Sequence, residues 1–407
     1  MESIFIQIAS YRDPELIPTI DDLLANADKP KRLTICVAHQ YSKDDAWDSL
    51  EKYSKDSRFI IIDIPYKESQ GACWARNQIQ QHYDGQDYTL QLDSHHRFVK
   101  GWDTLCIDMI KDLQTKGHNK PLLTSYIPSY NPKKDPKERE PTPWGMSFDR
   151  FTPEGVIFFL PYHMESNIKK PLPARFYSAH FAFTLGNFCL EVPHDPLLYF
   201  HGEEITIAVR AYTHGYDMFH PHKIIAWHEY TRNGRTKHWD DDSQWTDKNT
   251  RAHSRTRTLL GVDGAVCTPC NAKSFEGYNI GNNRTVADYE LYSGIRFKDR
   301  AITKACNLNS VPPGNKNDQY YPKFKHTFEF EKSTFSNKDY MFAALILLNQ
   351  DGDEIYRKDF YDFTNILSQQ LPRPSITVNE NIVKPKQWIL WAYAKNGGWA
   401  EKIEGTL

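Results

Sequence analysis

Short apolar runs, separated by longer polar segments, mark residues 1–100. Each run has the length of a β-strand, and each polar segment is long enough for a helix. The runs are Ile4–Ala9, Leu33–Ala38, Phe59–Ile64 and Tyr88–Leu92. Strands that alternate with helices in this way predict an α/β fold with a mostly parallel sheet and right-handed crossovers, an architecture that commonly binds nucleotides.

Polar residues follow the carboxyl ends of these predicted strands. Asp13-Pro14-Glu15 has the features of a helix start, because proline fits the first turn and acidic residues favour the positive end of the helix dipole. Ligands of open α/β sheets bind outside the carboxyl ends of strands. We therefore expect the loop Ser10–Asp13, the segment Val37–Gln40 and the end Leu92-Asp93 to border one crevice.

The middle of the chain combines an irregular segment with further regular elements. Residues 131–142 are rich in Lys, Asp, Glu and Pro, which predicts a surface loop and a candidate active-site lid. Ala179–Leu185 and Ile224–Trp227 have strand patterns. Apolar residues after Gly202 recur at helical spacing, and the predicted helix ends at Gly215.

Beyond about Asn315 the pattern changes to strands without long helices. The predicted strands are Thr327–Phe330, Tyr340–Leu348, Glu354–Phe360, Ser375–Val378 and Gln387–Ala394. A chain of 407 residues is also longer than the size, about 250–300 residues, at which single cores stop growing. We therefore predict a larger α/β domain over residues 1–315 and an all-β, sandwich-like module over residues 316–407.

Composition and charge narrow the range of partners and cellular locations to consider. Lys plus Arg number 50 against 52 for Asp plus Glu, so a nucleic-acid partner held by bulk charge is not indicated. The chain enters its first apolar run too early for a signal peptide, and no apolar stretch approaches the ~18 residues of a transmembrane segment. We expect a cytoplasmic protein, and the scattered cysteines agree with a reducing compartment. Cys267 and Cys270 lack the second pair of ligands that a zinc site needs, so we interpret them as free thiols.

Asp93-Ser94-His95 is the first candidate for chemistry. It follows an apolar strand, and residues two apart on an extended segment project to the same side, so Asp93 and His95 could bind one cation. A carboxylate with an imidazole suits Mn2+ or another divalent cation of similar character. His228, at the end of a later strand, is a candidate third ligand, although a histidine that bonds only to backbone would fit the sequence equally well.

A glycine-led helix and a pair of acids supply further candidates. Gly71 opens the helix that contains Arg76, whose guanidinium could hold a phosphate or a carboxylate such as Asp93. Glu203 and Glu204 begin a later helix, where capping alone favours glutamate. In the functional interpretation, one of these carboxylates contacts an acceptor hydroxyl or a hydroxyl of the donor sugar.

A basic and aromatic tract follows His228. It includes Tyr230, Arg232 and Arg235 and continues to His238-Trp239. This composition is typical of a loop that closes over phosphates, and solvated charge would explain it as well.

Together these motifs resemble glycosyltransferase family 60, the UDP-GlcNAc:polypeptide N-acetylglucosaminyltransferases, and more distantly the polypeptide N-acetylgalactosaminyltransferases. The matching segments fall within roughly residues 3–300, and both residues 131–142 and the β module lie outside them. They are Ile8–Pro14, Gly71-Ala72, Ala75–Asn77, Leu92–Phe98, Glu191–Pro196, Phe200–Glu204, Tyr212–Asp217 and Trp227-His228.

The resemblance implies a GT-A fold, a UDP-sugar donor, and retention of anomeric configuration. It implies a metal bound by Asp93, His95 and His228, with Glu203, Glu204 and Asp93 as catalytic residues. The donor would be bound by Ala9, Ser10, Tyr11, Arg12, Asp13, His39, Gly71, Arg76, Asp93, Ser94 and Arg232. We favour a front-face displacement in which a donor phosphate oxygen helps to remove the acceptor proton.

The predicted activity is transfer of N-acetylglucosamine from UDP-GlcNAc to a Ser, Thr or hydroxyproline of a protein. One alternative keeps the donor chemistry but glycosylates a cell-surface polysaccharide or a glycolipid. Another is a carbohydrate-binding or scaffold protein with a degenerate transferase domain, against which the intact metal motif argues. The aromatic residues Trp388, Trp391, Tyr393 and Trp399 of the β module could stack on sugars, pack in a core or form a homo-oligomer interface.

Overall fold

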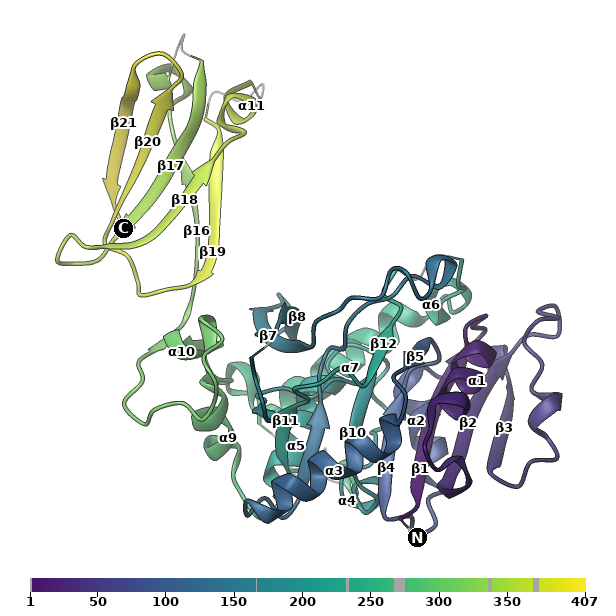
Figure 1. Cartoon of the computed structure of the whole chain (residues 1–407). Coiled ribbons are helices and arrows are strands. Elements are labelled where there is room, and N and C mark those ends of the chain that lie inside the picture. The colour runs from purple at the N-terminus through teal and green to yellow at the C-terminus, as the bar shows by residue number, and fades with distance from the viewer. Residues whose placement is uncertain (1, 166, 232–233, 267–274, 336–338, 369–372) are drawn as a thin grey trace. The chain divides into compact units, whose positions relative to one another are not determined.

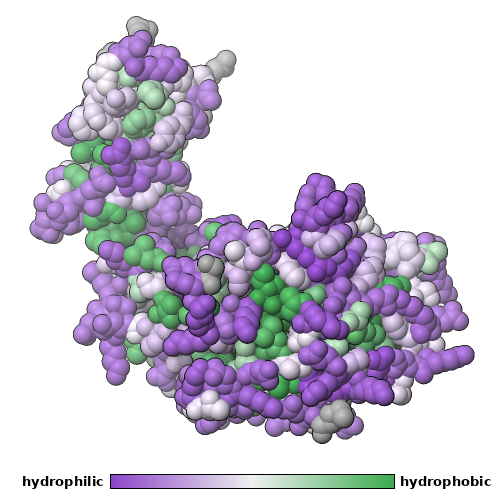
Figure 2. All heavy atoms as spheres, in the orientation of Figure 1, coloured by the Kyte–Doolittle hydropathy of each residue, from purple (hydrophilic) through white to green (hydrophobic). Residues whose placement is uncertain are grey.

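The computed structural model describes residues 2–165, 167–231, 234–266, 275–335, 339–368 and 373–407. The chain divides into two compact units. The first comprises Met1–Lys298 and Ala305–Asp318, and the second comprises Asp299–Lys304 and Gln319–Leu407. The surface seen in Figure 2 is largely hydrophilic and is interrupted by hydrophobic patches.

An eight-stranded sheet in the order β3-β2-β1-β4-β10-β6-β11-β9 forms the centre of the first unit (Figure 1). Its strands are β1 (Ile4–Tyr11), β2 (Leu33–Tyr41), β3 (Phe59–Pro65), β4 (Tyr88–Leu92), β6 (Pro121–Thr124), β9 (Leu172–Pro173), β10 (Phe181–Leu185) and β11 (Asp217–His220). The strands β1 to β4 are parallel, as predicted, whereas β10 lies antiparallel between β4 and β6. The α/β class is thereby confirmed, with a mixed sheet.

Helices cover both faces of this sheet, which explains why its strands are apolar throughout. On one face, Ile4, Ile6 and Ile8 of β1 join the core formed with α1 (Leu16–Asn26) and α3 (Trp102–Thr115). On the other face, Phe5 packs in a cluster with residues of α2 (Ala72–Gln80). Because successive residues of a strand face opposite sides, a strand covered on both sides loses the alternation of polar and apolar positions.

The remaining elements of the first unit border the carboxyl ends of the sheet or pack around it. Its further strands and α-helices are β5 (His96–Phe98), β7 (Trp144–Phe151), β8 (Ile157–His163), β12 (Ala226–His228), β13 (Ile295–Arg296), α4 (Phe188–Glu191), α5 (Glu203–Thr213), α6 (His238–Asp241), α7 (Trp245–Leu260) and α9 (Val286–Ser293), and α10 (Lys304–Asn307) follows. Short 3-10 helices are η1 (Pro30–Arg32), η2 (Glu51–Tyr53), η3 (Tyr66–Glu68), η4 (Pro132–Lys134) and η5 (Val262–Gly264). Strand β12 pairs antiparallel with β5, which places His228 opposite His96.

The second unit consists of antiparallel strands in two main sheets that share a core. One sheet pairs β16 (Lys323–Glu329) with β19 (Ser375–Asn381), and the other has the order β18-β17-β20-β21. The strands of the second sheet are β17 (Tyr340–Leu348), β18 (Glu354–Phe360), β20 (Gln387–Ala394) and β21 (Gly398–Thr406). Smaller elements are β14 (Ala301–Thr303), β15 (Tyr320–Tyr321), η7 (Lys332–Phe335) and α11 (Phe363–Ser368). Side chains from both sheets, including Phe328, Leu345 and Leu390, form one apolar cluster, as expected of a sandwich.

Among the helices within the described ranges, none combines the length and the apolar character that crossing a bilayer requires. The cysteines of the predicted Cys267–Cys270 motif lie outside the described residues.

Candidate active site

A cavity of about 400 Å³ opens beside the carboxyl ends of β1 and β4, where the predicted crevice was expected. Its volume lies in the range of sites for small ligands. Many of the residues singled out from the sequence line it. They are Ala9, Tyr11, Asp13, Gly71, Arg76, Asp93, Ser94, His95, Glu203, Glu204 and His228.

Other predicted donor-binding residues lie away from the cavity wall. Ser10 and His39 alternate along their strands with residues that do line it, and Gln40 takes the place expected of His39. The His39 ring instead contacts carboxylates, with its Nδ1 2.7 Å from an oxygen of Asp63. Arg12 bonds to the carboxylates of Asp45 and Asp241. Arg232 lies outside the described residues.

Asp93, His95 and His228 come together as a potential metal-binding group. Each offers one ligand atom, and these atoms all lie within 4.8 Å of one another. The Oδ2 atom of Asp93 is 3.3 Å from Nε2 of His228 and 3.7 Å from Nε2 of His95. One carboxylate oxygen and two imidazole nitrogens suit Mn2+ and similar divalent cations. The pairing of β12 with β5 brings His228 to the loop that carries the other two residues.

Among metal ligands, imidazoles must be neutral and carboxylates ionised, and His228 and Asp93 have these protonation states. Burial lowers the pKa of His228 well below its usual value, and the neighbouring His95 lowers it further, so the imidazole is neutral; its Nε2 atom, which contacts Asp93, offers a lone pair to a metal when the ring proton is on Nδ1. Burial alone would raise the pKa of Asp93. The hydrogen bond with His228 and the charge of Arg76 outweigh burial and bring that pKa well below its usual range, so Asp93 is ionised.

Asp13 fixes the orientation of His95 from behind. Its Oδ2 atom lies 2.8 Å from Nδ1 of His95, accepts a 2.7 Å bond from Oγ of Ser94, and is 3.1 Å from Nη1 of Arg235. Burial raises the pKa of Asp13, but the interactions with His95 and Arg235 prevail and bring it to about 2. A proton on Nδ1 directed at this carboxylate would leave Nε2 as the nitrogen able to bind a metal, and Nη1 of Arg235, which can only donate, also lies 3.0 Å from Nε2.

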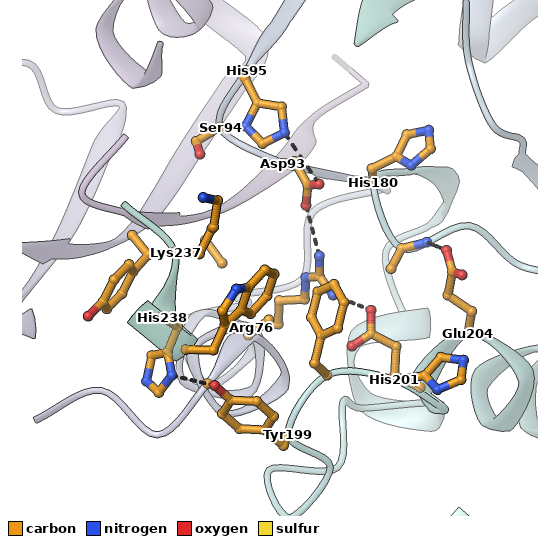
Figure 3. A pocket seen from close by; sticks show the side chains of 18 of the residues that line it. Arg76, Asp93, Ser94, His95, His180, Tyr199, His201, Glu204, Lys237 and His238 are labelled. Atoms are coloured by element: carbon orange, nitrogen blue, oxygen red, sulfur yellow. Dashed lines mark hydrogen bonds and ion pairs between the residues drawn. The ribbon is translucent and has the colours of Figure 1, made fainter. Parts of the chain in front are cut away.

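Arg76 connects Asp93 to Glu203. The guanidinium donates to Oδ1 of Asp93 at 2.9 Å and to Oε1 of Glu203 at 2.6 Å, and Figure 3 shows Asp93 between Arg76 and His95. The other oxygen of Glu203 accepts from the Cys73 thiol. Because Arg76 and Glu203 are both buried, each depends on the other for compensation of its charge.

Gly71 is required by the shape of this region. It precedes α2 with a φ of +113°, a conformation that residues with a side chain rarely adopt. A Cβ atom at this position would lie 2.9 Å from the carbonyl oxygen of Tyr199, which also lines the cavity. The glycine therefore lets the start of α2 approach the opposite wall.

Glu204 is held differently from Glu203. Its Oε1 atom accepts from the backbone N–H of Ala179 at 2.9 Å, and its Oε2 atom accepts from the Tyr126 hydroxyl at 3.1 Å. Burial, reinforced by the charge of Glu203, raises the pKa of Glu204 to about 8. The group is therefore mostly protonated at neutral pH. The catalytic roles expected of Glu203 and Glu204 stay predictions.

Several lining residues were not singled out from the sequence. His180 stacks on the ring of His228 with centroids 4.3 Å apart and planes at 23°, and its Nε2 accepts from the backbone N–H of Ile127 at 3.2 Å. Tyr126 and Phe158 also line the cavity. No local pattern marks these residues, because His180 is simply one position of a predicted strand and Phe158 belongs to the unpredicted β7–β8 hairpin.

The tract that follows His228 reaches the cavity, whereas the candidate lid does not. Tyr230, Arg235 and Lys237–Trp239 belong to the lining, and the closing of this tract over phosphates stays a prediction. No residue of 131–142 belongs to it among those that the structure describes. Within that segment Arg139 bonds to Asp135 and lies over the ring of Trp227.

A family model described as Glycosyltransferase (GlcNAc) matches residues 3–58 and 46–299. No curated protein matches the chain. Among solved structures, GalNAc-T7 with UDP, GalNAc and Mn2+ has a TM-score of 0.52 at 12% identity, and the match covers 99% of this chain and 71% of that chain. This likeness confirms the expected GT-A fold.

Two further solved structures match with lower TM-scores. TarS of S. aureus is 13% identical with a TM-score of 0.38, and the match covers 99% of this chain and 77% of that one. The mannosyltransferase PcManGT from Pyrobaculum calidifontis, in complex with GDP-Man and Mn2+, is 12% identical with a TM-score of 0.35. The match covers 67% of this chain and 79% of the mannosyltransferase chain.

Proposed function

Because the chain belongs to the Glycosyltransferase (GlcNAc) family, we propose that it is a metal-dependent, retaining enzyme of the family 60 type. In this proposal it transfers N-acetylglucosamine from UDP-GlcNAc to a hydroxyl group of a protein. The observation that carries the proposal is the group formed by Asp93, His95 and His228 on the wall of a cavity large enough for a small ligand. The presence of UDP and Mn2+ in the GalNAc-T7 structure supports the same donor chemistry.

Asp93, His95 and His228 would hold the divalent cation, which when bound neutralises the charge of the departing diphosphate. Asp13 keeps Nε2 of His95 directed at this position, and Arg76 holds the carboxylate of Asp93. Arg235 and Lys237 place donor groups on the cavity wall, and each is paired with a carboxylate, Arg235 with Asp13 and Lys237 with Asp240. Fixed charges of this kind favour the leaving group without reorganisation during the reaction.

The contacts of the acidic residues favour a front-face displacement. Within the described ranges, each carboxylate that lines the cavity is engaged by a cation, a hydroxyl or a backbone N–H, and we assign none of them as a covalent nucleophile; they are Asp13, Asp93, Glu203 and Glu204. In the proposed step the acceptor oxygen bonds to the anomeric carbon on the side from which the diphosphate leaves. The bond from that carbon to the phosphate oxygen breaks, and the acceptor proton passes to an oxygen of the departing phosphate.

Metal-dependent turnover of UDP-GlcNAc tests the donor part of the proposal. We expect activity with Mn2+, loss of activity with EDTA, and a fall of about 100-fold or more in kcat for Asp93→Ala, His95→Ala and His228→Ala. His163→Ala is the matched control, because that side chain is exposed and lies outside the cavity lining. Full activity of the Asp93 or His95 variant in the presence of EDTA would contradict the assignment.

The acceptor is tested separately by mass spectrometry of candidate proteins after incubation with UDP-GlcNAc. The proposal expects a mass increase of one N-acetylhexosamine on a Ser, Thr or hydroxyproline. Products found only on polysaccharides or glycolipids would reject the protein acceptor and retain the donor chemistry. Parallel reactions with UDP-GalNAc compare the two donors, which differ in the orientation of one hydroxyl group.

A further inference from the structure

The four-stranded sheet of the second unit has two different faces. On β17, Ala343, Leu345 and Leu347 face the core shared with β16 and β19. Phe342, which precedes them, and the residues that alternate with them face the other side. The outer face of a sandwich is usually polar, so apolar residues on this side need an explanation.

Aromatic rings form a continuous row across that outer face. Phe342 of β17 lies opposite Tyr393 of β20, which lies opposite Trp399 of β21. The rings of Phe342 and Tyr393 are stacked, with centroids 5.2 Å apart and planes at 6°, and the ring of Trp399 stands 5.4 Å from that of Tyr393 at 87°. These strands are adjacent in Figure 1.

Two more rings extend the row. Tyr361, which follows β18, lies 5.6 Å from Phe342, and Trp391 of β20 lies 4.6 Å from Trp399. We call these five residues, Tyr361, Phe342, Tyr393, Trp399 and Trp391, the aromatic strip. Tyr361 is 75% exposed and Trp399 is 40% exposed, so a ligand can reach the strip from solvent. Trp388 does not belong to it, because its ring packs on the core residue Phe328.

The charges beside the aromatic strip are paired. The guanidinium of Arg357 lies 5.6 Å from the ring of Trp399 and bonds to Asp359 at 2.9 Å. The Lys402 amine lies 5.7 Å from the ring of Trp391 and pairs with Glu404 at 2.8 Å. Each cation next to a ring thus has its own carboxylate, which leaves the strip flanked by hydrogen-bonding groups but without excess charge.

We infer that the aromatic strip binds an uncharged oligosaccharide. A pyranose ring has an apolar face of C–H groups that can stack on an aromatic ring, while its hydroxyls can bond to both carboxylates and cationic donors at the edge. A polyanion would instead need cations without carboxylate partners. Phe342 and Tyr393 stack on each other, so the exposed rings of Tyr361 and Trp399 would supply the faces for sugars. This inference concerns the second unit alone and does not depend on the proposed transferase activity.

Calorimetric titration of the full chain tests the inference without any nucleotide donor. The probes are the uncharged tetrasaccharides chitotetraose, cellotetraose and maltotetraose, with heparin as the polyanion. We expect at least one tetrasaccharide to bind, and Tyr361→Ala with Trp399→Ala to weaken binding by about tenfold or more. Trp245→Ala is the matched control, since that side chain is exposed on α7 of the first unit.

Circular dichroism verifies folding, and the single variant Tyr361→Ala provides a second test because its side chain is largely exposed. A folded Tyr361→Ala chain should bind the tetrasaccharide several-fold more weakly than the wild type. The inference is overturned if no tetrasaccharide binds up to roughly 10 mM, if only heparin binds, or if the strip variants bind like the wild type. It is also overturned if light scattering shows that the variants dissociate a wild-type oligomer that binds no sugar.

Discussion

Replacing Asp13 with asparagine tests whether this residue orients a metal ligand or contacts the donor. The substitution keeps the size and shape of the side chain and removes its charge. In the structure, the affected oxygen lies 2.8 Å from Nδ1 of His95 and 2.7 Å from Oγ of Ser94. The amide can still accept one of these bonds, but it no longer increases the basicity of the imidazole or fixes its tautomer as firmly.

The expected effect is a weaker bond to the cation. Loss of a carboxylate behind a metal-binding histidine typically costs about 10–100-fold in metal affinity, which corresponds to about 1.4–2.7 kcal/mol. Once Mn2+ is saturating, His95 again holds the ion, so kcat should change much less than the affinity. Asp13→Asn should therefore shift the Mn2+ dependence of UDP-GlcNAc turnover to higher concentrations.

The assay measures the apparent dissociation constant of Mn2+ with UDP present, from the electron paramagnetic resonance signal of the free ion, together with kcat at saturating metal. Asp45→Asn is the matched control, because this carboxylate bonds to Arg12 at 2.7 Å and does not line the cavity. An unchanged Mn2+ affinity in a folded Asp13→Asn variant would refute the orienting role. A raised KM for UDP-GlcNAc with unchanged metal affinity would instead favour the donor contact predicted for the loop that contains Asp13.

Two further substitutions distinguish the contributions of Glu203 and Glu204 to stability. Glu203→Ala leaves the buried Arg76 without one of its two carboxylates and should lower the free energy of unfolding by about 3 kcal/mol in urea titrations. The control is Glu138→Ala, which removes an exposed ion pair and should have no measurable effect. Equal free energies of unfolding for the two variants would contradict the argument. The pKa of Glu204, raised to about 8, means that the folded state holds a proton that the unfolded state releases near its usual pKa, so wild-type stability should fall as pH rises between these two values. Glu204→Gln should show a smaller fall over that range in thermal unfolding, and an identical slope would show that Glu204 titrates normally.

Local sequence patterns were sufficient to predict the bounds of several strands. The bounds predicted for β4, β17, β18 and β20 match those of the structure. Strand β21 escaped prediction because none of its residues is fully buried, and its glycines and charged residues interrupt the apolar alternation. The antiparallel direction of β10 was equally inaccessible, since a buried strand has the same apolar pattern in either direction.

The spacing of Asp93 and His95 could be interpreted from the sequence because a short extended segment directs both side chains to one side. Neighbouring motifs also indicated which strand ends would surround them. The remaining contacts join residues that are distant along the chain: His228 reaches the group through the pairing of β12 with β5, Asp13 meets His95, and Glu203 meets Arg76. His228 was a candidate ligand from its place at a strand end, but the contacts themselves arise from how strands and helices pack, which no local pattern records.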